Sequence, residues 1–142
     1  MYYLCIKLIN KQNNTIMACR QKLITKEIEK LIAKYPYLSQ DGKGLDAKVL
    51  VKFFLPCSGA TWYITEGEKL ENGDYILYGW VSLGYGYEFG PVMFSELENL
   101  KVKFMWSYAQ VERDIMVDNG KDTLRDMCKY DYQLKEDLSF LA

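Results

Sequence analysis

The most consequential absence from this chain of 142 residues is histidine, which does not occur at all. Without histidine the chain cannot use Ser-His-Asp or Cys-His catalysis, and it offers no imidazole ligand to a metal ion. Cysteine is scarce and dispersed, so no CxxC pair exists and a zinc site is disfavoured. We therefore expect reduced thiols, no metal site and no cofactor. The four cysteines are Cys5, Cys19, Cys57 and Cys128.

An excess of charge of one sign is also missing, because 18 basic residues face 19 acidic residues. Nucleic-acid binding usually needs a basic excess or a basic stripe, since neutralising phosphates supplies most of the affinity. We therefore favour a protein partner, or a small molecule, over a nucleic acid.

Long hydrophobic runs are absent as well. The apolar run from Tyr2 to Ile9 is interrupted by Lys7 and is too short to cross a bilayer. It also lacks the basic start and the apolar length of a signal peptide. We expect a cytoplasmic protein that has no membrane association.

Aromatic residues are abundant, at 15% of the chain, which favours a β-rich domain. The length fits a single domain. Apolar residues at helical spacing predict a helix that begins after Thr25 and ends at Pro36. Ser95 and Glu98 have the spacing of a capping box at the start of a short helix, and residues 123–138 predict a C-terminal helix.

Strand patterns lie between these helices. Asn72-Gly73 predicts a hairpin turn, residues 84–90 a loop or bent strand, and residues 101–109 either a strand or a loop. The fold predicted is α+β: an antiparallel meander of about 4–6 strands with an N-terminal amphipathic helix, a short capped helix near 95–100 and a C-terminal helix. Strands are expected at residues 2–9, 47–55, 61–66, 75–83 and 111–117.

Four blocks carry a resemblance to a known family: DGKGLDAKVLVKFF (41–54), TWYITE (61–66), FSELENL (94–100) and VERDIMV (111–117). In this order they resemble the uncharacterised bacterial family DUF2958, over about residues 22–118. The resemblance implies a short protein of plasmids, integrative elements and phages, with no settled activity. It further implies that residues 1–21 are an extension, with Met17 as an alternative start, and that residues 121–142 are an appended C-terminal helical tail.

Two glycine-containing segments are candidate binding loops. Asp41 and Lys43 flank Gly42, but a helix precedes this loop and a strand follows it, which is the wrong order for a phosphate-binding loop. We interpret it as a turn, with Asp41 and Lys43 as candidate contact residues. Tyr85 and Tyr87 belong to GYGYEFG, either as part of a bulged strand or as rings that stack on a partner.

Charged residues in the predicted strands suggest a candidate catalytic cluster. Glu112 and Asp114 would share one face of a strand, with Arg113 on the other face as a binding residue. Paired carboxylates can bind Mg²⁺ or act as acid and base. The cluster proposed is Asp46, Lys52, Glu66, Glu112 and Asp114. The alternative is an ordinary ion pair between Lys52 and either Glu66 or Glu112.

Three functional hypotheses follow. The favoured one is a small non-enzymatic protein-interaction module of a mobile element or phage, which binds a host or element-encoded protein. The first alternative is a metal-dependent phosphodiester hydrolase that uses the carboxylate–lysine cluster. The second is single-stranded nucleic-acid binding by the tyrosine-rich sheet.

Overall fold

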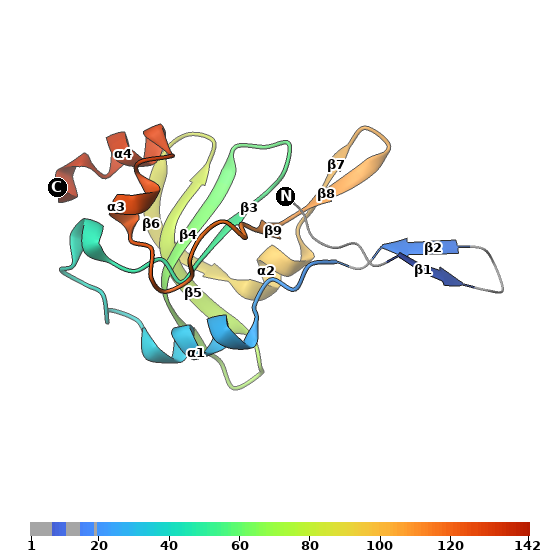
Figure 1. Ribbon diagram of the computed structural model, residues 1–142, viewed down its shortest axis with the longest axis horizontal. Coiled ribbons are helices and arrows are strands. Elements are labelled where there is room, and N and C mark those ends of the chain that lie inside the picture. The colour runs from blue at the N-terminus through green and yellow to red at the C-terminus, as the bar shows by residue number, and fades with distance from the viewer. Residues whose placement is uncertain (1–6, 11–14, 19) are drawn as a thin grey trace.

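The computed structural model describes residues 7–10, 15–18 and 20–142 and confirms the α+β class (Figure 1). Its elements are β1 (Lys7–Asn10), β2 (Thr15–Ala18), α1 (Lys26–Lys34), β3 (Val51–Phe54), β4 (Ala60–Lys69), β5 (Tyr75–Leu83), β6 (Tyr87–Met93), α2 (Phe94–Asn99), β7 (Lys101–Phe104), β8 (Ser107–Gln110), β9 (Glu112–Arg113), α3 (Leu124–Met127) and α4 (Tyr132–Asp137). Short 3₁₀ turns lie at Gly44–Asp46 and Ser139–Leu141.

The central sheet has five antiparallel strands in the order β6-β5-β4-β3-β9. Strands β3 to β6 are consecutive neighbours, which confirms the predicted antiparallel meander. The hairpin between β4 and β5 turns at Asn72-Gly73 as expected: Gly73 has a φ of 86°, and its N–H donates to the carbonyl of Leu70 at 3.0 Å. The left-handed backbone explains why glycine occupies this position.

Helices cover both faces of the sheet. Neighbouring residues of a strand point to opposite faces, and Trp62 packs in a first core while Tyr63 packs in a second. The first core contains α1 and α2, and the second contains the C-terminal helices. Residues 121–142, expected as an appended tail, contribute directly to the second core through the buried side chains of Leu124, Met127, Leu134 and Leu138.

Helix α1 is fixed at both ends by local chemistry. The Thr25 hydroxyl accepts a hydrogen bond from the N–H of Ile28 at 3.3 Å, and the helix ends at Lys34, with Tyr35 as its C-cap next to Pro36. Its buried side chains are Ile28 and Ile32, one turn apart, so a single stripe of the helix faces the first core.

The strand expected at residues 47–55 is regular only from Val51 to Phe54. A regular strand over residues 47–55 would place Val49 and Val51 on one face, but Val49 packs in the second core and Val51 in the first. The pairing of β4 with β5 shifts between Ile64 and Glu66, and the N–H of Leu50 donates to Ile64 opposite this irregularity. Such a β-bulge re-aims the side chains next to it.

The start of α2 corrects the capping-box prediction. The helix begins at Phe94, so Ser95 lies inside the first turn and provides no cap for it. Instead Asp74, from the β4–β5 turn, accepts a hydrogen bond from the N–H of Ser95 at 3.0 Å. The hydrogen bonds from Ser95 and from the Tyr75 backbone hold the pKa of Asp74 below its ordinary value.

The last predicted strand is also shorter than expected. The regular strand covers only Glu112–Arg113, which pairs with β3. The N–H of Asp114 still donates to the carbonyl of Lys52 at 2.9 Å, but its carboxylate accepts from the N–H of Met116 at 2.9 Å. An aspartate that bonds the backbone two residues on forms a turn.

The expected C-terminal helix is two short helices. Thr123 and Asp126 form a capping box at the start of α3, and the Asp131 carboxylate caps α4 at the N–H of Leu134, so the chain stops and restarts between them. The expected N-terminal strand at 2–9 begins within residues 1–6, outside the described residues, and residues 7–10 pair with residues 15–18.

Candidate functional site

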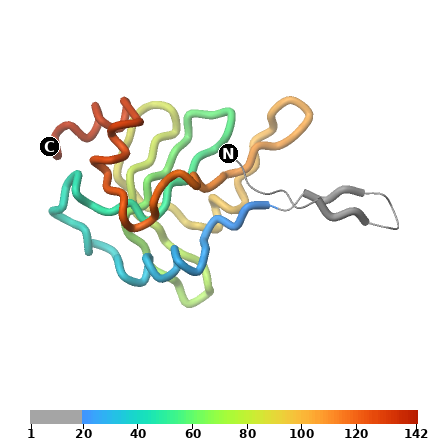
Figure 2. The backbone as a smooth tube through the Cα atoms, in the orientation of Figure 1, coloured from blue at the N-terminus to red at the C-terminus, as the bar shows by residue number. Residues whose placement is uncertain are grey.

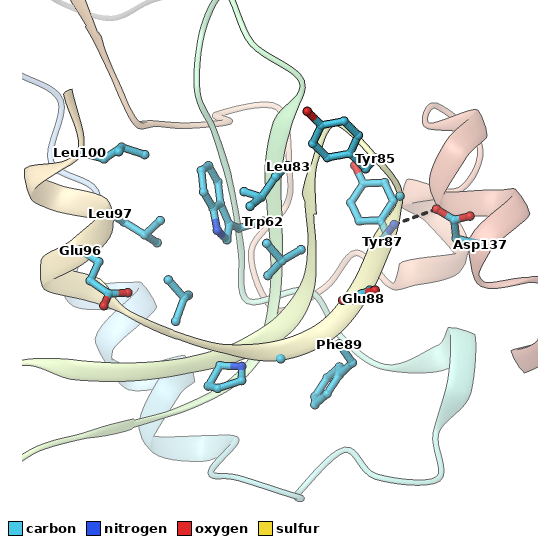
Figure 3. Close-up of a pocket in the computed structure, with 15 residues that line it drawn as sticks. Trp62, Leu83, Tyr85, Tyr87, Glu88, Phe89, Glu96, Leu97, Leu100 and Asp137 are labelled. Atoms are coloured by element: carbon cyan, nitrogen blue, oxygen red, sulfur yellow. Dashed lines mark hydrogen bonds between the residues drawn. The ribbon is translucent and has the colours of Figure 1, made fainter. Parts of the chain in front are cut away.

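A groove of about 810 Å³ lies beside α2 and β6, and its lining includes Trp62 and Leu97 of the first core and Tyr87, which packs against the second core (Figure 3). We call it the β6 groove. Its volume is within the range of pockets that enclose ligands. Trp62 and Leu83 lie between the side chains of α2 and the turn that carries Tyr85, as Figure 3 shows. The apolar lining comprises Trp62, Val81, Leu83, Phe89, Pro91, Val92, Leu97 and Leu100.

The secondary structure explains why these side chains meet. Trp62 is paired with Val81 across β4 and β5, and paired residues of neighbouring strands lie on the same face. Leu97 and Leu100 are three residues apart at the end of α2, so both face the sheet. The groove is therefore built by regular elements, which hold its apolar surface in place.

The rim of the groove is acidic. Glu88, Glu96 and Asp137 line it, and none of the lysines and arginines that the structure describes does. Within the part of the chain that the structure describes, Glu88 and Glu96 form no ion pair. Asp137 accepts hydrogen bonds from the N–H of Tyr87 at 2.8 Å and from the side chain of Gln133 at 2.9 Å. The groove thus combines apolar walls with uncompensated negative charge, which favours a ligand that carries positive charge.

Strand β6 forms the outer edge of the sheet beside this groove, but this edge is protected. The N–H of Tyr87 donates to Asp137 and therefore points away from β5. Alternate residues share this direction, which places Pro91, without an N–H, in the same outward row. These features disfavour pairing with a further strand, so the groove must recognise side chains.

The opposite edge of the sheet is protected too. The side-chain amide of Gln21 accepts from the N–H of Arg113 at 2.8 Å and donates to its carbonyl at 3.1 Å. This amide takes the place of a neighbouring strand along β9.

A second candidate surface is the hairpin β7–β8, which extends away from the central sheet (Figures 1 and 2). We call residues 101–110 the aromatic arm. All four residues of β7 are exposed, and Trp106 at the tip is 92% exposed. The exposed large apolar side chains of the arm are Val102, Phe104, Met105, Trp106 and Tyr108.

The structure distributes the predicted catalytic cluster over separate places. Lys52 pairs with Asp114 at 3.2 Å, and not with Glu66 or Glu112 as the alternative prediction had it. Asp46 pairs with Arg125 at 3.2 Å on the surface. Glu66 is only 3% exposed and accepts from the N–H of Gln40 at 2.8 Å. Among the described residues no group of three or more Asp, Glu or Cys side chains could hold a metal ion.

The five predicted binding residues do not lie together in the structure. Tyr85, which is 98% exposed, and Tyr87 both line the β6 groove. The Lys43 ammonium lies 5.4 Å from the ring centroid of Tyr35, and the N–H of Asp41 closes a turn with Leu38. Arg113 donates to the carbonyl of Lys22 at 3.4 Å. Of these five residues, only the two tyrosines lie in the groove.

A partly buried polar network lies at the second core. The hydroxyls of Tyr63 and Tyr87 both donate to Oδ2 of Asp131, at 2.9 and 2.6 Å. Burial raises the pKa of Tyr63 and of Tyr87, and the Asp131 carboxylate raises both further. The Lys52 ammonium lies 5.4 Å from the ring centroid of Tyr63, at the wall of a second cavity of about 800 Å³. These neutral phenols fasten α4 to the sheet.

The sequence patterns missed the apolar and acidic residues of the groove, and also the aromatic arm. One signal for the arm was present in the sequence. The apolar run Phe104-Met105-Trp106 follows Lys101 and Lys103, in a stretch whose pattern fits either a strand or a loop. No local signal connects Glu88 with Glu96, because they become neighbours of one groove only when β6 and α2 fold together.

A family model described as "Protein of unknown function (DUF2958)" matches residues 23–131. The match extends past residue 118, where the resemblance in the sequence was expected to end, and includes Asp131. No curated protein and no solved structure matches the chain. In the described part of the chain, no helix has both the length and the apolar character needed to cross a bilayer.

Proposed function

The chain belongs to the DUF2958 family, whose description assigns no activity, and from its exposed surfaces we propose that it is a non-enzymatic protein-interaction module. In this proposal the aromatic arm is the main contact surface. The resemblance to proteins of mobile elements and phages suggests a host or element-encoded partner in the bacterial cytoplasm.

The exposed apolar side chains of the aromatic arm are the observation that carries this proposal. Met105 and Trp106 at the tip are 66% and 92% exposed, and Phe104 and Tyr108 beside them are exposed as well. Contiguous apolar surface of this kind marks interaction sites, and tryptophan and tyrosine are enriched among the residues that dominate binding energy. An isolated two-stranded hairpin is only marginally stable in water, so a partner that packs against the arm would also stabilise it.

The two alternatives receive less support from the geometry. A metal-dependent hydrolase needs several carboxylates around one ion, whereas Asp46 and Asp114 are engaged by different basic residues and Glu66 is buried elsewhere. Stacking of nucleic-acid bases on the sheet needs open aromatic faces, whereas Tyr63 is buried beneath the C-terminal helices.

The proposal can be tested by affinity capture with the tagged full chain in bacterial lysate. The variant Phe104→Ala/Trp106→Ala should lose at least tenfold of any specifically captured protein, with an unchanged melting temperature because both side chains are exposed. Tyr130→Ala is the matched control, since Tyr130 is an equally exposed aromatic residue outside the arm. Equal capture by the arm variant, or no specific capture by the unmodified chain, would count against the proposal.

A further inference from the structure

We propose that the aromatic arm of one molecule docks in the β6 groove of a second copy of the same chain. This inference rests on the proposed function, because it names a partner for the arm. It is carried by an independent observation: the chemistry of the groove complements that of the arm.

The charges of the two surfaces are opposite. The arm, KVKFMWSYAQ, contains Lys101 and Lys103 and no acidic residue. The groove is lined by Glu88, Glu96 and Asp137 and, among the residues that the structure describes, by no basic side chain. An arm that enters the groove would bring its two ammonium groups to carboxylates that lack an ion-pair partner among the described residues. Charges desolvated together in this way favour the correct partner and speed its association.

The apolar parts of the two surfaces also match. The tip residues Phe104, Met105 and Trp106 are convex and exposed, whereas Leu83 and the buried Trp62 lie in a concave surface. Side chains alternate along β7, so Lys101 and Lys103 lie on one face of the arm and Phe104 on the other. The tip can therefore enter the apolar part of the groove while the lysines stay at its rim. This mode needs no strand pairing, which the protected edge of β6 disfavours.

The geometry of the chain points to docking between molecules. The arm begins at Lys101, immediately after Leu100, which lines the end of the groove. From there it extends away from the sheet, as Figures 1 and 2 show. A β6 groove that accepts this tip would therefore belong to another molecule.

Each copy has one arm and one groove, so this contact is heterologous. Such contacts form closed rings or open chains, depending on the rotation between copies. In an open assembly the first and last copies keep one free arm and one free groove. Self-association is therefore compatible with the capture of a different protein.

Sedimentation velocity over a concentration series, using the full chain, tests the inference. The unmodified protein should associate reversibly. The arm variant Phe104→Ser/Trp106→Ser and the groove variant Glu88→Lys/Glu96→Lys should each be monomeric, with unchanged far-ultraviolet circular dichroism. An equimolar mixture of the two variants should form a dimer and nothing larger, because only one intact arm and one intact groove remain.

A charge exchange provides a second test that does not depend on apolar contacts. Lys101→Glu/Lys103→Glu should weaken self-association at least tenfold. Mixing this variant with Glu88→Lys/Glu96→Lys should restore it, since the signs are reversed on both surfaces.

Three outcomes would overturn the inference: an unmodified chain that stays monomeric up to about 1 mM, a groove variant that still self-associates, or variants that fail to complement each other. If capture of a foreign protein depends on the arm while the chain stays monomeric, the proposed function survives and only the second copy is excluded as partner. If the chain self-associates but captures no foreign protein through the arm, docking between copies survives and a foreign partner of the arm is excluded.

Discussion

The hydroxyl of Tyr63 in β4 donates a hydrogen bond to Oδ2 of Asp131, 68 residues later in the chain, across 2.9 Å. The same carboxylate oxygen accepts from Tyr87, and the other oxygen accepts from the N–H of Leu134 at 3.0 Å. Asp131 thus joins two strands of the sheet to the start of α4.

Replacing Asp131 should therefore destabilise the fold more than an ordinary surface change. Asp131→Ala leaves two phenols without their acceptor and removes a helix cap, so we expect a loss of about 2–4 kcal/mol in the free energy of unfolding. Asp131→Asn should lose less, because asparagine also caps helices. Urea unfolding monitored by circular dichroism measures both. Equal losses for the two variants would show that the helix cap adds nothing and that the carboxylate charge accounts for the whole effect.

The same network predicts a dependence of stability on alkaline pH. Burial raises the pKa of Tyr63 in the folded state, whereas in the unfolded chain it titrates near its ordinary value of about 10. Above about pH 10 the unfolded state therefore binds fewer protons than the folded state, and stability falls as the pH rises. The fall should be about 1.4 kcal/mol per pH unit for this tyrosine.

Lysines titrate in the same range, so the comparison must be made against Tyr63→Phe. Denaturant unfolding between pH 9 and about 11.5 should give a steeper decline for the unmodified chain than for this variant. If the free energy of unfolding declines equally with pH for both proteins, Tyr63 is not the source of the alkaline loss of stability.

Gly79 and Gly90 face each other across β5 and β6 and form a matched pair for a packing test. A Cβ at Gly79 would overlap the carbonyl oxygen of Tyr63 and lie 2.8 Å from Cα of Ile64, whereas a Cβ at Gly90 would meet nothing within 4 Å. Because the obstacles at Gly79 are backbone atoms, Gly79→Ala should lose about 3 kcal/mol or more. Gly90→Ala should melt within a few degrees of the unmodified protein, as calorimetry can show.

The correction at α2 gives a further prediction. Asp74 caps this helix from the β4–β5 turn, while the side chain of Glu98 has no such role. Asp74→Ala should lower the melting temperature by a few degrees, and Glu98→Ala should leave it nearly unchanged. Since folding depresses the pKa of Asp74, its contribution is present above an unfolded pKa of about 3.9 and is lost as the pH falls further. A larger fall in melting temperature for Glu98→Ala than for Asp74→Ala would instead support the capping box of Ser95 and Glu98.

The parts of the fold that follow from neighbouring residues could be predicted from the sequence. Strand β5 spans Tyr75–Leu83 as expected, and the turn at Asn72-Gly73 joins it to β4. These features depend on alternation and on the backbone freedom of glycine, which are local. The errors lie where distant residues intervene, as at the start of α2, where Asp74 supplies the cap.

The candidate site was likewise predicted only where neighbouring residues determine it. Tyr85 and Tyr87 were found as candidate contact residues because glycines surround them, and both line the β6 groove. The expected convergence of Lys52 with four carboxylates failed except for Asp114, because strand register and the turn at Asp114 decide which side chains meet. Sequence spacing cannot supply that register.

By itself the sequence determined the α+β class, the antiparallel meander and the family, and the absence of histidine excluded imidazole chemistry. Only the tertiary structure decided that Glu88 and Glu96 flank one apolar groove and that the arm around Trp106 is exposed. The physical reason is that local propensity and periodicity act over a few residues, whereas a groove or an exposed arm is defined by which distant segments pack together and which remain without a neighbour.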